Sequence, residues 1–407
     1  MPASGDAIRG YEARIAAYER AIGERLDERR ARRDPGRTRR RRLPRGRVGS
    51  PRVRRILVMT WLLLMADVTV SFTSAMLKPS SAGFGVNAVE WLRDNGAAGL
   101  VSEFESIYYS FNAPATGGTA LKALPEVGNG TAAEQAYAPA PIAPVIDPPL
   151  PGEGAWHGTG PLVRGAPPVL VTTFRPDPNY PQMVAGVAWI DSSRAWVQLY
   201  PGMYEPPNPG NPLAEVPPQL RVGLLATFNS AFKLEDDAAG FVAFGHVYAQ
   251  LKPGQATFVR YRNGSADIRT WTGGTEPGPD VEFARQNLPL IVEGGQLNPN
   301  LGDGPQWGAT LGNAVRVWRS GVGIDARGNV LYAAANDQTA TSLAEILKRA
   351  GAVRAMELDI NYEWVTFNFY TGFGALGPSK LLPGMSRAAT RYLTPDDRDF
   401  FAVYVRH

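Results

Sequence analysis

The chain has 407 residues, 44% hydrophobic and 20% charged, so most of it can fold around a packed core. It contains no cysteine, which excludes disulfide bonds, thiolate metal sites and cysteine nucleophiles. The net charge of +4 is uneven: residues 1–55 hold 18 arginines against 7 acidic residues, or +11, and the rest carries −7, so a nucleic-acid-binding role for the whole protein loses its main support.

The first 55 residues form a basic tail in two parts. Residues 7–33 have a helix-forming composition, with an apolar stripe at spacings of three or four residues that fits a coiled-coil seam or a helix lying on a surface. The remainder is too charged to pack. We expect its arginine cluster to lie against anionic lipid head groups, with nucleic acid as the alternative partner. The cluster consists of Arg39, Arg40, Arg41 and Arg42.

Residues 56–77 are apolar apart from Asp67 and, as a helix, would extend about 33 Å, enough for a hydrocarbon core of roughly 30 Å. Three arginines precede the segment and Lys78 follows it. This asymmetry predicts a single transmembrane helix, an uncleaved signal-anchor, with a cytoplasmic N-terminus and an extracytoplasmic domain at the cell envelope. A cleaved signal peptide, with its shorter apolar stretch, is the main alternative. A buried core helix fits the neighbouring arginines poorly. Asp67 is either tolerated by an otherwise apolar segment, or it marks the position where a second helix contacts this one in the membrane.

Two connecting segments follow. Residues 78–112 predict a juxtamembrane helical hairpin broken at Gly96. Residues 113–167 are rich in proline, alanine and glycine and predict an extended, semi-rigid linker.

Residues 168–407 predict an α+β domain that is mixed and mostly β. Its strands are apolar runs separated by turn residues, including a hairpin turn at Asn263-Gly264. The expected strands are 169–174, 185–191, 195–200, 224–229, 240–245, 256–262 and 265–271, followed by a hairpin over 320–335.

The periodicity then changes to that of a helix. Ser342 and Glu345 have the spacing of a capping box, and Gly351 is placed to end the helix. An apolar strand follows at 352–360. Strand, helix and strand in this order predict a crossover unit within a mixed sheet.

Polar residues at strand ends are the candidates for chemistry. Asp359 ends the strand after the helix, and Glu357 shares its face. Asn229 and Lys233 follow a buried strand, and Arg319 leads into an apolar strand, where a guanidinium suits phosphate recognition. Glu293 precedes two glycines that permit close approach of a ligand. Each has a plain structural alternative, such as a turn, a cap or a surface ion pair.

The order of these motifs resembles the phosphodiester glycosidase family over about residues 168–405. The resemblance is strongest in SGVGIDARGNVLYAAAN and TSLAEILKRAGAVRAMELD. By position, Asn229, Arg319 and Asp359 match the family's asparagine, arginine and aspartate, and Glu293 matches a polar residue before glycine. Two glycine pairs of the family are replaced, by Ser230-Ala231 and by Ile360-Asn361.

The resemblance implies hydrolysis of a sugar-1-phosphate diester in an extracytoplasmic glycan. In that reaction the leaving phosphate needs a cation more than a strong acid. We therefore expect catalysis by Asp359, with Arg319 stabilising the phosphate and Glu293 as a second carboxylate. Asn229, Lys233 and Glu357 are the predicted substrate-binding residues.

The sequence gives little sign of a metal or a histidine-based mechanism. The chain has two histidines besides the terminal one and no cysteine, so zinc is not expected. No cofactor is expected. Calcium, bound by carboxylate and backbone oxygens, remains an open alternative. The alternative function is a non-catalytic module that binds envelope glycan. A scaffold that assembles partners through the tail is compatible with either.

Overall fold

The computed structural model describes residues 51–111, 114–128, 137–207, 214–237, 239–302, 304–308 and 316–406. The chain divides into two units, Met1–Val68 and Thr69–His407, each considered by itself. The predicted tail helix at 7–33 and the four-arginine cluster lie outside the described residues.

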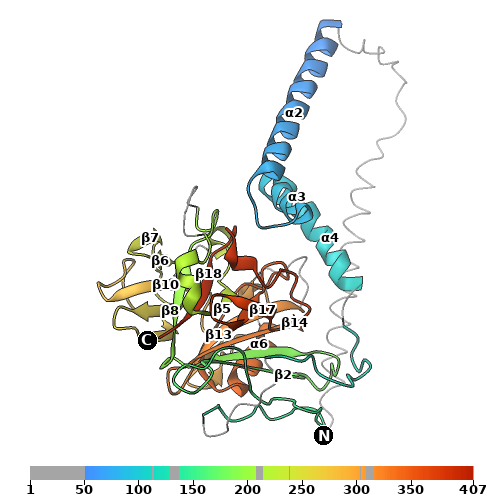
Figure 1. The fold of residues 1–407 in the computed structure, drawn as a ribbon. Helices are drawn as coiled ribbons and strands as arrows, with labels where there is room; N and C mark the ends of the chain where they lie inside the picture. The colour runs from blue at the N-terminus through green and yellow to red at the C-terminus, as the bar shows by residue number, and fades with distance from the viewer. Residues whose placement is uncertain are drawn as a thin grey trace. The chain divides into compact units, whose positions relative to one another are not determined.

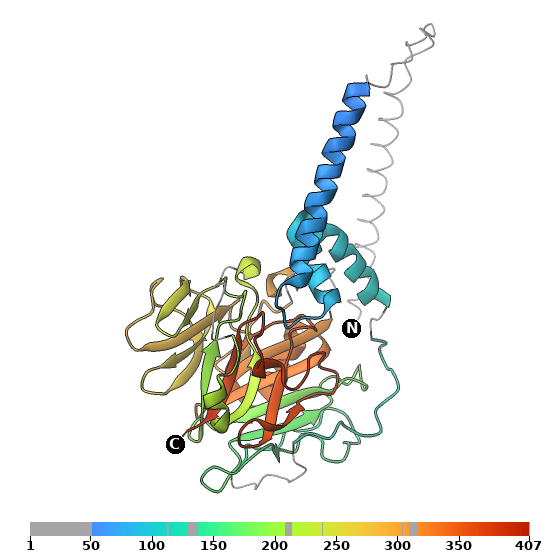
Figure 2. The ribbon, with the colours of Figure 1, turned by 45° about the horizontal axis from the view of Figure 1, so that its top comes forward.

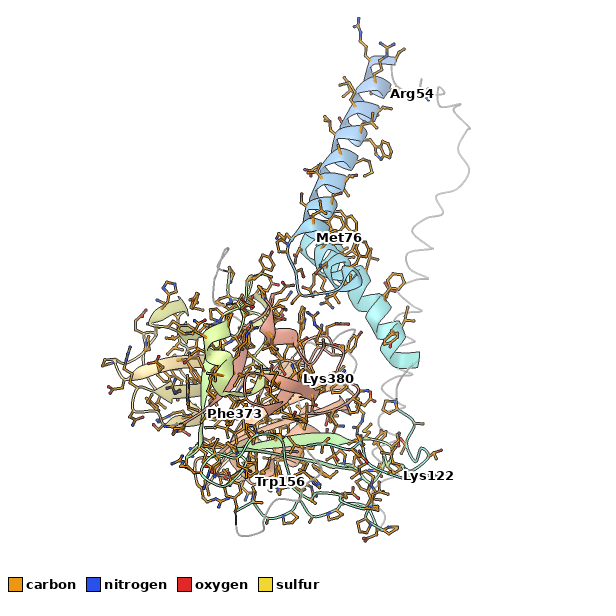
Figure 3. The ribbon with its side chains drawn as sticks, in the orientation of Figure 1. Arg54, Met76, Lys122, Trp156, Phe373 and Lys380 are labelled. Atoms are coloured by element: carbon orange, nitrogen blue, oxygen red, sulfur yellow. The ribbon has the colours of Figure 1, made fainter. Side chains whose placement is uncertain are left out.

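Helix α2, Pro51–Leu77, begins five residues before the predicted apolar segment. Among the described residues it is the one helix long and apolar enough to cross a membrane. Its side chains project outward along its length between the labelled Arg54 and Met76 (Figure 3), and none is buried. The apolar segment is therefore not a core helix, which removes one of the alternatives.

The juxtamembrane segment contains two helices joined at a kink (Figure 2). Helix α3, Phe84–Leu92, passes through a π-helical turn, η1, Arg93–Ala97, into α4, Ala98–Phe111. The break lies at Gly96, whose φ of +84° is a conformation that glycine adopts without strain.

Three sheets build the rest of Thr69–His407, and every strand pair in them is antiparallel within the described residues (Figure 1). The first sheet has the order β1-β2-β3-β14-β13-β15-β11-β12 and is formed by His157–Gly158, Val169–Phe174, Ala185–Ile190, Val330–Gln338, Val317–Asp325, Ala352–Glu357, Val292–Glu293 and Gln296–Leu297. The second has the order β7-β6-β10-β8-β9 and is formed by His246–Ala249, Phe241–Ala243, Val281–Asn287, Ala256–Tyr261 and Ala266–Thr270. The third has the order β17-β16-β5-β18-β4 and is formed by Leu376–Lys380, Phe367–Gly372, Leu224–Asn229, Phe400–Val405 and Ala195–Tyr200.

Few helices accompany these strands, so the predicted α+β, mostly β class is confirmed. They are α5, Leu234–Asp237, α6, Ala340–Arg349, and the 3-10 turns η2, Pro218–Gly223, η3, Gly304–Trp307, and η5, Arg391–Leu393. The crossover prediction needs one refinement. Strands β14 and β15 run in the same direction, but each pairs antiparallel with β13, which lies between them.

Helix α6 covers one face of the first sheet, with apolar side chains such as Leu343 and Leu347 packed against Leu170 and Leu331. The other face packs against the third sheet, where Phe228, Phe367 and Phe401 stack. The predicted capping box is wrong in its position. Thr339 caps the helix and exchanges hydrogen bonds with Ser342, because the helix begins at Ala340, one turn earlier than expected.

The predicted linker is packed against the domain in its second half. Ile142 and Trp156 are buried in the core beside α6, and Trp156 lies among the side chains of the domain in Figure 3. Glu153 forms a buried ion pair with Arg175, whose Nη2 lies 2.7 Å from its Oε2. The proline-rich composition carried no information on this burial.

Candidate active site

Asn229, at the end of β5, links the third sheet to the first. Its amide nitrogen donates to Ser320 Oγ on β13 at 3.0 Å and to the carbonyl oxygen of Ser230 at 3.0 Å. Its side-chain oxygen accepts from the hydroxyl of Tyr332 at 2.8 Å and from the N–H of Thr366 at 3.0 Å. The side chain is 2% exposed, so its amide is occupied by internal hydrogen bonds.

Arg319 lies beside Ser320 on β13 and is also buried. Its guanidinium forms an ion pair with Glu357 and donates to the carbonyl oxygens of Gln338, at 3.0 Å, and Trp307, at 3.1 Å. Burial raises the pKa of Glu357 above its usual value, and the charge of Arg319 opposes that shift. Glu357 Oε2 has no hydrogen-bond partner among the described residues. The pair therefore joins two neighbouring strands inside the protein.

Asp359 lies two residues beyond β15 and connects this interior to the surface. Its backbone oxygen accepts from Ser320 Oγ at 2.7 Å, and its Oδ1 accepts from the N–H of Asn361 at 2.9 Å. Its Oδ2 accepts from Arg398 Nη2 at 2.8 Å. Burial raises the pKa of this carboxyl, which is 6% exposed, and the guanidinium of Arg398 opposes the shift.

A cavity of about 580 Å³ lies against Arg398. Trp364 and Lys233 line it from the domain, and the guanidinium carbon of Arg398 lies 5.3 Å from the ring centre of Trp364. Lys233 is ion-paired with Glu90 of α3, which lines the same cavity. Burial lowers the pKa of Lys233, but Glu90 outweighs this and the net shift is upward. Lys233 therefore carries a charge at the cavity wall.

The structure thus brings four predicted residues into one connected region: Asn229 and Asp359 both bond to Ser320, Arg319 is its neighbour, and Glu357 pairs with Arg319. Of the six predicted site residues, Lys233 alone lines the cavity. Glu293 lies elsewhere. It is the exposed last residue of β11, next to Val292, which pairs with Ala355. It therefore lies toward the opposite end of β15 from Asp359, about 16 Å along the strand.

Two charged residues of this region were absent from the sequence prediction. Arg398 comes from the segment Thr394-Pro-Asp-Asp-Arg-Asp, whose dense charge next to an apolar strand was a usable signal. Glu205 lines the cavity, is 7% exposed and accepts from the N–H of Leu234 at 2.6 Å. Burial raises its pKa, and Arg398 opposes the shift. Glu205 lies in a proline-rich loop with no motif to mark it.

A metal site in the described residues would need acidic side chains and histidines gathered around one point. No group of three or more histidine, cysteine, aspartate and glutamate side chains there is arranged to hold an ion. Asp359 and Glu205 instead face a guanidinium, so the local charge is balanced by protein groups.

Comparison with known proteins finds similar structures and one matching family model. Fourteen chains of solved structures match this chain, and three of them are as follows. The zebrafish N-acetylglucosamine-1-phosphodiester alpha-N-acetylglucosaminidase catalytic domain, auto-inhibited by its pro-peptide, has 14% identity and a TM-score of 0.39, with 61% of this chain and 86% of that chain covered. A hypothetical protein from Synechocystis has 11% identity and a TM-score of 0.37, with 60% and 63% covered. An exported protein from Burkholderia pseudomallei has 13% identity and a TM-score of 0.34, with 56% and 75% covered.

These TM-scores are too low for the three structures to inform the assignment, and no curated protein matches the chain. The sequence model of the family described as phosphodiester glycosidase matches residues 226–359. This segment begins in β5, three residues before Asn229, and ends on Asp359. The match confirms the resemblance found in the sequence, over residues 226–359 of this chain.

Proposed function

We propose that the domain hydrolyses a glycosyl phosphodiester in an extracytoplasmic glycan, at the cavity beside Arg398. The observation that carries the proposal is the connection between the family segment and this cavity. Within the segment, Asn229 and Asp359 meet at Ser320, and Asp359 accepts a 2.8 Å hydrogen bond from Arg398, which lines the cavity. A carboxylate and a guanidinium in contact are the two groups that this reaction needs.

We assign the catalytic roles from the position of each residue relative to the cavity. Asp359 accepts a proton from a water molecule that attacks the anomeric carbon, or it attacks that carbon itself and forms a glycosyl ester that water then hydrolyses. In either case the bond from the anomeric carbon to the phosphate oxygen breaks. The bonding electrons leave with the phosphate monoester, whose charge Arg398 and Lys233 stabilise. Arg319 and Asn229, predicted to contact the substrate, are assigned positioning roles instead. Their polar atoms bond inside the protein and hold Ser320 and β15 in place.

The charge of the cavity restricts how an anion can enter. Its described lining contains three cations, Lys78, Lys233 and Arg398, and five carboxyls, Glu90, Asp94, Glu205, Glu235 and Asp397. Burial raises the pKa of Asp94, Glu205 and Asp397, so these three take up protons more readily than exposed carboxyls. A substrate phosphate then competes mainly with Glu90 for Lys233.

We propose that α2 anchors this domain to the membrane with the N-terminus in the cytoplasm. The length and apolar character of α2 support the span, and the arginines before it support the orientation. The arginine cluster at residues 39–42 then lies at the anionic head groups of the cytoplasmic leaflet.

A non-catalytic glycan-binding module is the second candidate. It is favoured by the replacement of the two glycine pairs and by the burial of Asn229 and Arg319. Such a module would keep the cavity and lose turnover.

One assay separates the two candidates. The full-length protein in detergent is incubated with a panel of sugar-1-phosphodiesters, and sugar release is measured. We expect turnover in the wild type and a loss of at least about 100-fold in Asp359→Asn. The matched control is Asp280→Asn, the same change at an exposed loop residue, which should retain the wild-type rate. Binding without turnover across the panel would contradict the hydrolase and support the binding module.

A further inference from the structure

A second cavity, of about 430 Å³, lies among the turns at the far end of β13 from Arg319. Arg319 is near the start of β13, whereas Arg327 follows its last residue, Asp325. Six residue steps of extended strand, from Arg319 to Asp325, place the turn that holds Arg327 roughly 20 Å from Arg319. Turns from all three sheets line this cavity, which is distinct from the one beside Asp359. The lining residues from these turns include Ser193, Asn263, Ser265 and Gly328.

Three arginines line this cavity, and none of its described lining residues is acidic. Arg406 donates to the carbonyl oxygens of Gly264, at 2.7 Å, and Ala195, at 3.3 Å. Arg327 is largely exposed, and its Nε lies 4.0 Å from the carboxylate of Asp325. The positive charge is therefore matched mainly by neutral carbonyl oxygens and by one distant carboxylate.

Arg260, the third arginine, is partly buried and held in a fixed orientation. Its guanidinium carbon lies 4.6 Å from the ring centre of Trp196. That ring is fixed in turn, because its N–H donates to the carbonyl oxygen of Val405 at 3.1 Å and it packs against Tyr404. Fixing a guanidinium before binding reduces the entropy lost when a ligand arrives.

The hydrogen-bonding capacity of Arg260 is only partly used. Its Nη1 donates to Gln198 Oε1 at 3.1 Å, but its buried Nε has no partner among the described residues. A buried N–H without an acceptor costs free energy, and more so on a charged group. Burial lowers the pKa of Arg260, the carboxylate of Glu282 opposes that shift, and like-charge repulsion from Arg406 adds to it. An anion in the cavity would relieve the repulsion between Arg260 and Arg406.

We propose that this cavity is a second binding site that takes a phosphate group, held by Arg260 and Arg406 with Arg327 at the rim. The planar guanidinium matches the oxygen geometry of phosphate and forms short, charge-assisted hydrogen bonds to it. Hydroxyl groups of the neighbouring turns, such as that of Ser193, supply further donors. The phosphate belongs either to a free ion or to a phosphodiester-linked glycan.

Phosphate titration of the full-length protein in detergent, at constant ionic strength maintained with chloride, tests the site. Calorimetry should show saturable binding of inorganic phosphate that weakens by about 10-fold or more in Arg260→Gln and in Arg406→Gln. Arg327→Gln changes an exposed side chain that cannot disturb folding, and it should weaken binding to a smaller extent. Circular dichroism checks that the first two variants fold.

Two controls separate this site from others. Lys252→Gln makes the same charge change at an exposed residue before the start of β8, at the opposite end of that strand from Asn263. This variant should bind phosphate as the wild type does. Asp359→Asn should also leave this binding unchanged. A phosphodiester-linked polysaccharide that binds more tightly per phosphate than the free ion identifies the glycan as the source, and equal affinity identifies the free ion. Equal phosphate affinity in the wild type and all three arginine variants, or no binding, would overturn the site.

Discussion

The carboxylate of Asp359 accepts a hydrogen bond of 2.8 Å from Arg398, a residue 39 positions further along the chain and outside the family segment. Asp359 belongs to the strand end that the sequence singled out, and Arg398 lines the cavity. The contact therefore joins the segment matched by the family model to the lining of the cavity. In the proposed reaction, the cationic role passes from Arg319, which faces Glu357 in the interior, to Arg398.

The Arg319–Glu357 ion pair should matter for stability. Arg319→Met leaves the Glu357 carboxylate buried without its cation, and such a loss costs about 3–5 kcal/mol. The double variant Arg319→Met/Glu357→Leu removes both charges and should recover most of that free energy. Denaturant unfolding of the two variants checks this. Equal stability of the single variant and the wild type would show that the pair is not buried as described.

The pH dependence of stability should reveal Glu205. Burial raises its pKa in the folded protein above the usual 4.5, so it contributes stability below pH 4.5 that is lost as the pH rises through the folded pKa. The unfolding free energy of the wild type minus that of Glu205→Gln should therefore fall as the pH rises above 4.5.

Glu153 provides the opposite case in the same experiment. Burial raises its pKa, but hydrogen bonds from Arg175 and from backbone N–H groups outweigh this and lower it overall. The stability it contributes is present above pH 4.5 and is lost as the pH falls through the folded pKa. Slopes of the same sign for Glu205→Gln and Glu153→Gln would contradict the two environments.

The ion pair between Glu90 and Lys233 should weaken substrate binding. Glu90→Gln frees the Lys233 ammonium for the phosphate, so we expect a lower KM, by about 3-fold to 10-fold, with little change in kcat. Steady-state kinetics on the diester that the wild type hydrolyses measure both constants. A matched change at Glu276, which is exposed on a loop, should leave KM unaltered. A raised KM in Glu90→Gln would instead assign Glu90 to substrate binding.

The absence of cysteine from the chain allows a clean test of topology. Thr272→Cys, at an exposed position after β9, should react with a membrane-impermeant maleimide in intact cells. Ser50→Cys, before α2, should react only after the membrane is permeabilised. Labelling of Ser50→Cys in intact cells would reverse the proposed orientation.

Local patterns predicted strands that are short, apolar and bounded by turn residues, but they missed β10, β16, β17 and β18. Strands 169–174, 195–200 and 224–229 have the predicted bounds in the structure. Helix α6 was predicted to start too late, because Thr339 and Ser342 form a capping pair that the Ser342–Glu345 spacing concealed. Both capping patterns, Thr339–Ser342 and Ser342–Glu345, are local in sequence. Which of them forms hydrogen bonds is visible only in the structure.

The candidate site was predicted only in part, for a different reason. Asn229 and Asp359 stand at strand ends, which sequence can identify. Their meeting at Ser320 depends on how two sheets pack. Arg398 approaches from a third segment, and Glu293, which has an equally suggestive sequence context, is directed to another part of the sheet by the pairing of Val292 with Ala355. Long-range pairing of this kind has no signature in a single sequence.

The bond that is broken tests the central claim most directly. Hydrolysis of a sugar-1-phosphodiester in water enriched in oxygen-18, followed by mass spectrometry of the released phosphate monoester, distinguishes attack at carbon from attack at phosphorus. A carboxylate at Asp359 acting at the anomeric carbon predicts an unlabelled phosphate monoester. Oxygen-18 in the phosphate would show cleavage of the phosphorus–oxygen bond and would contradict a glycosidase at this site.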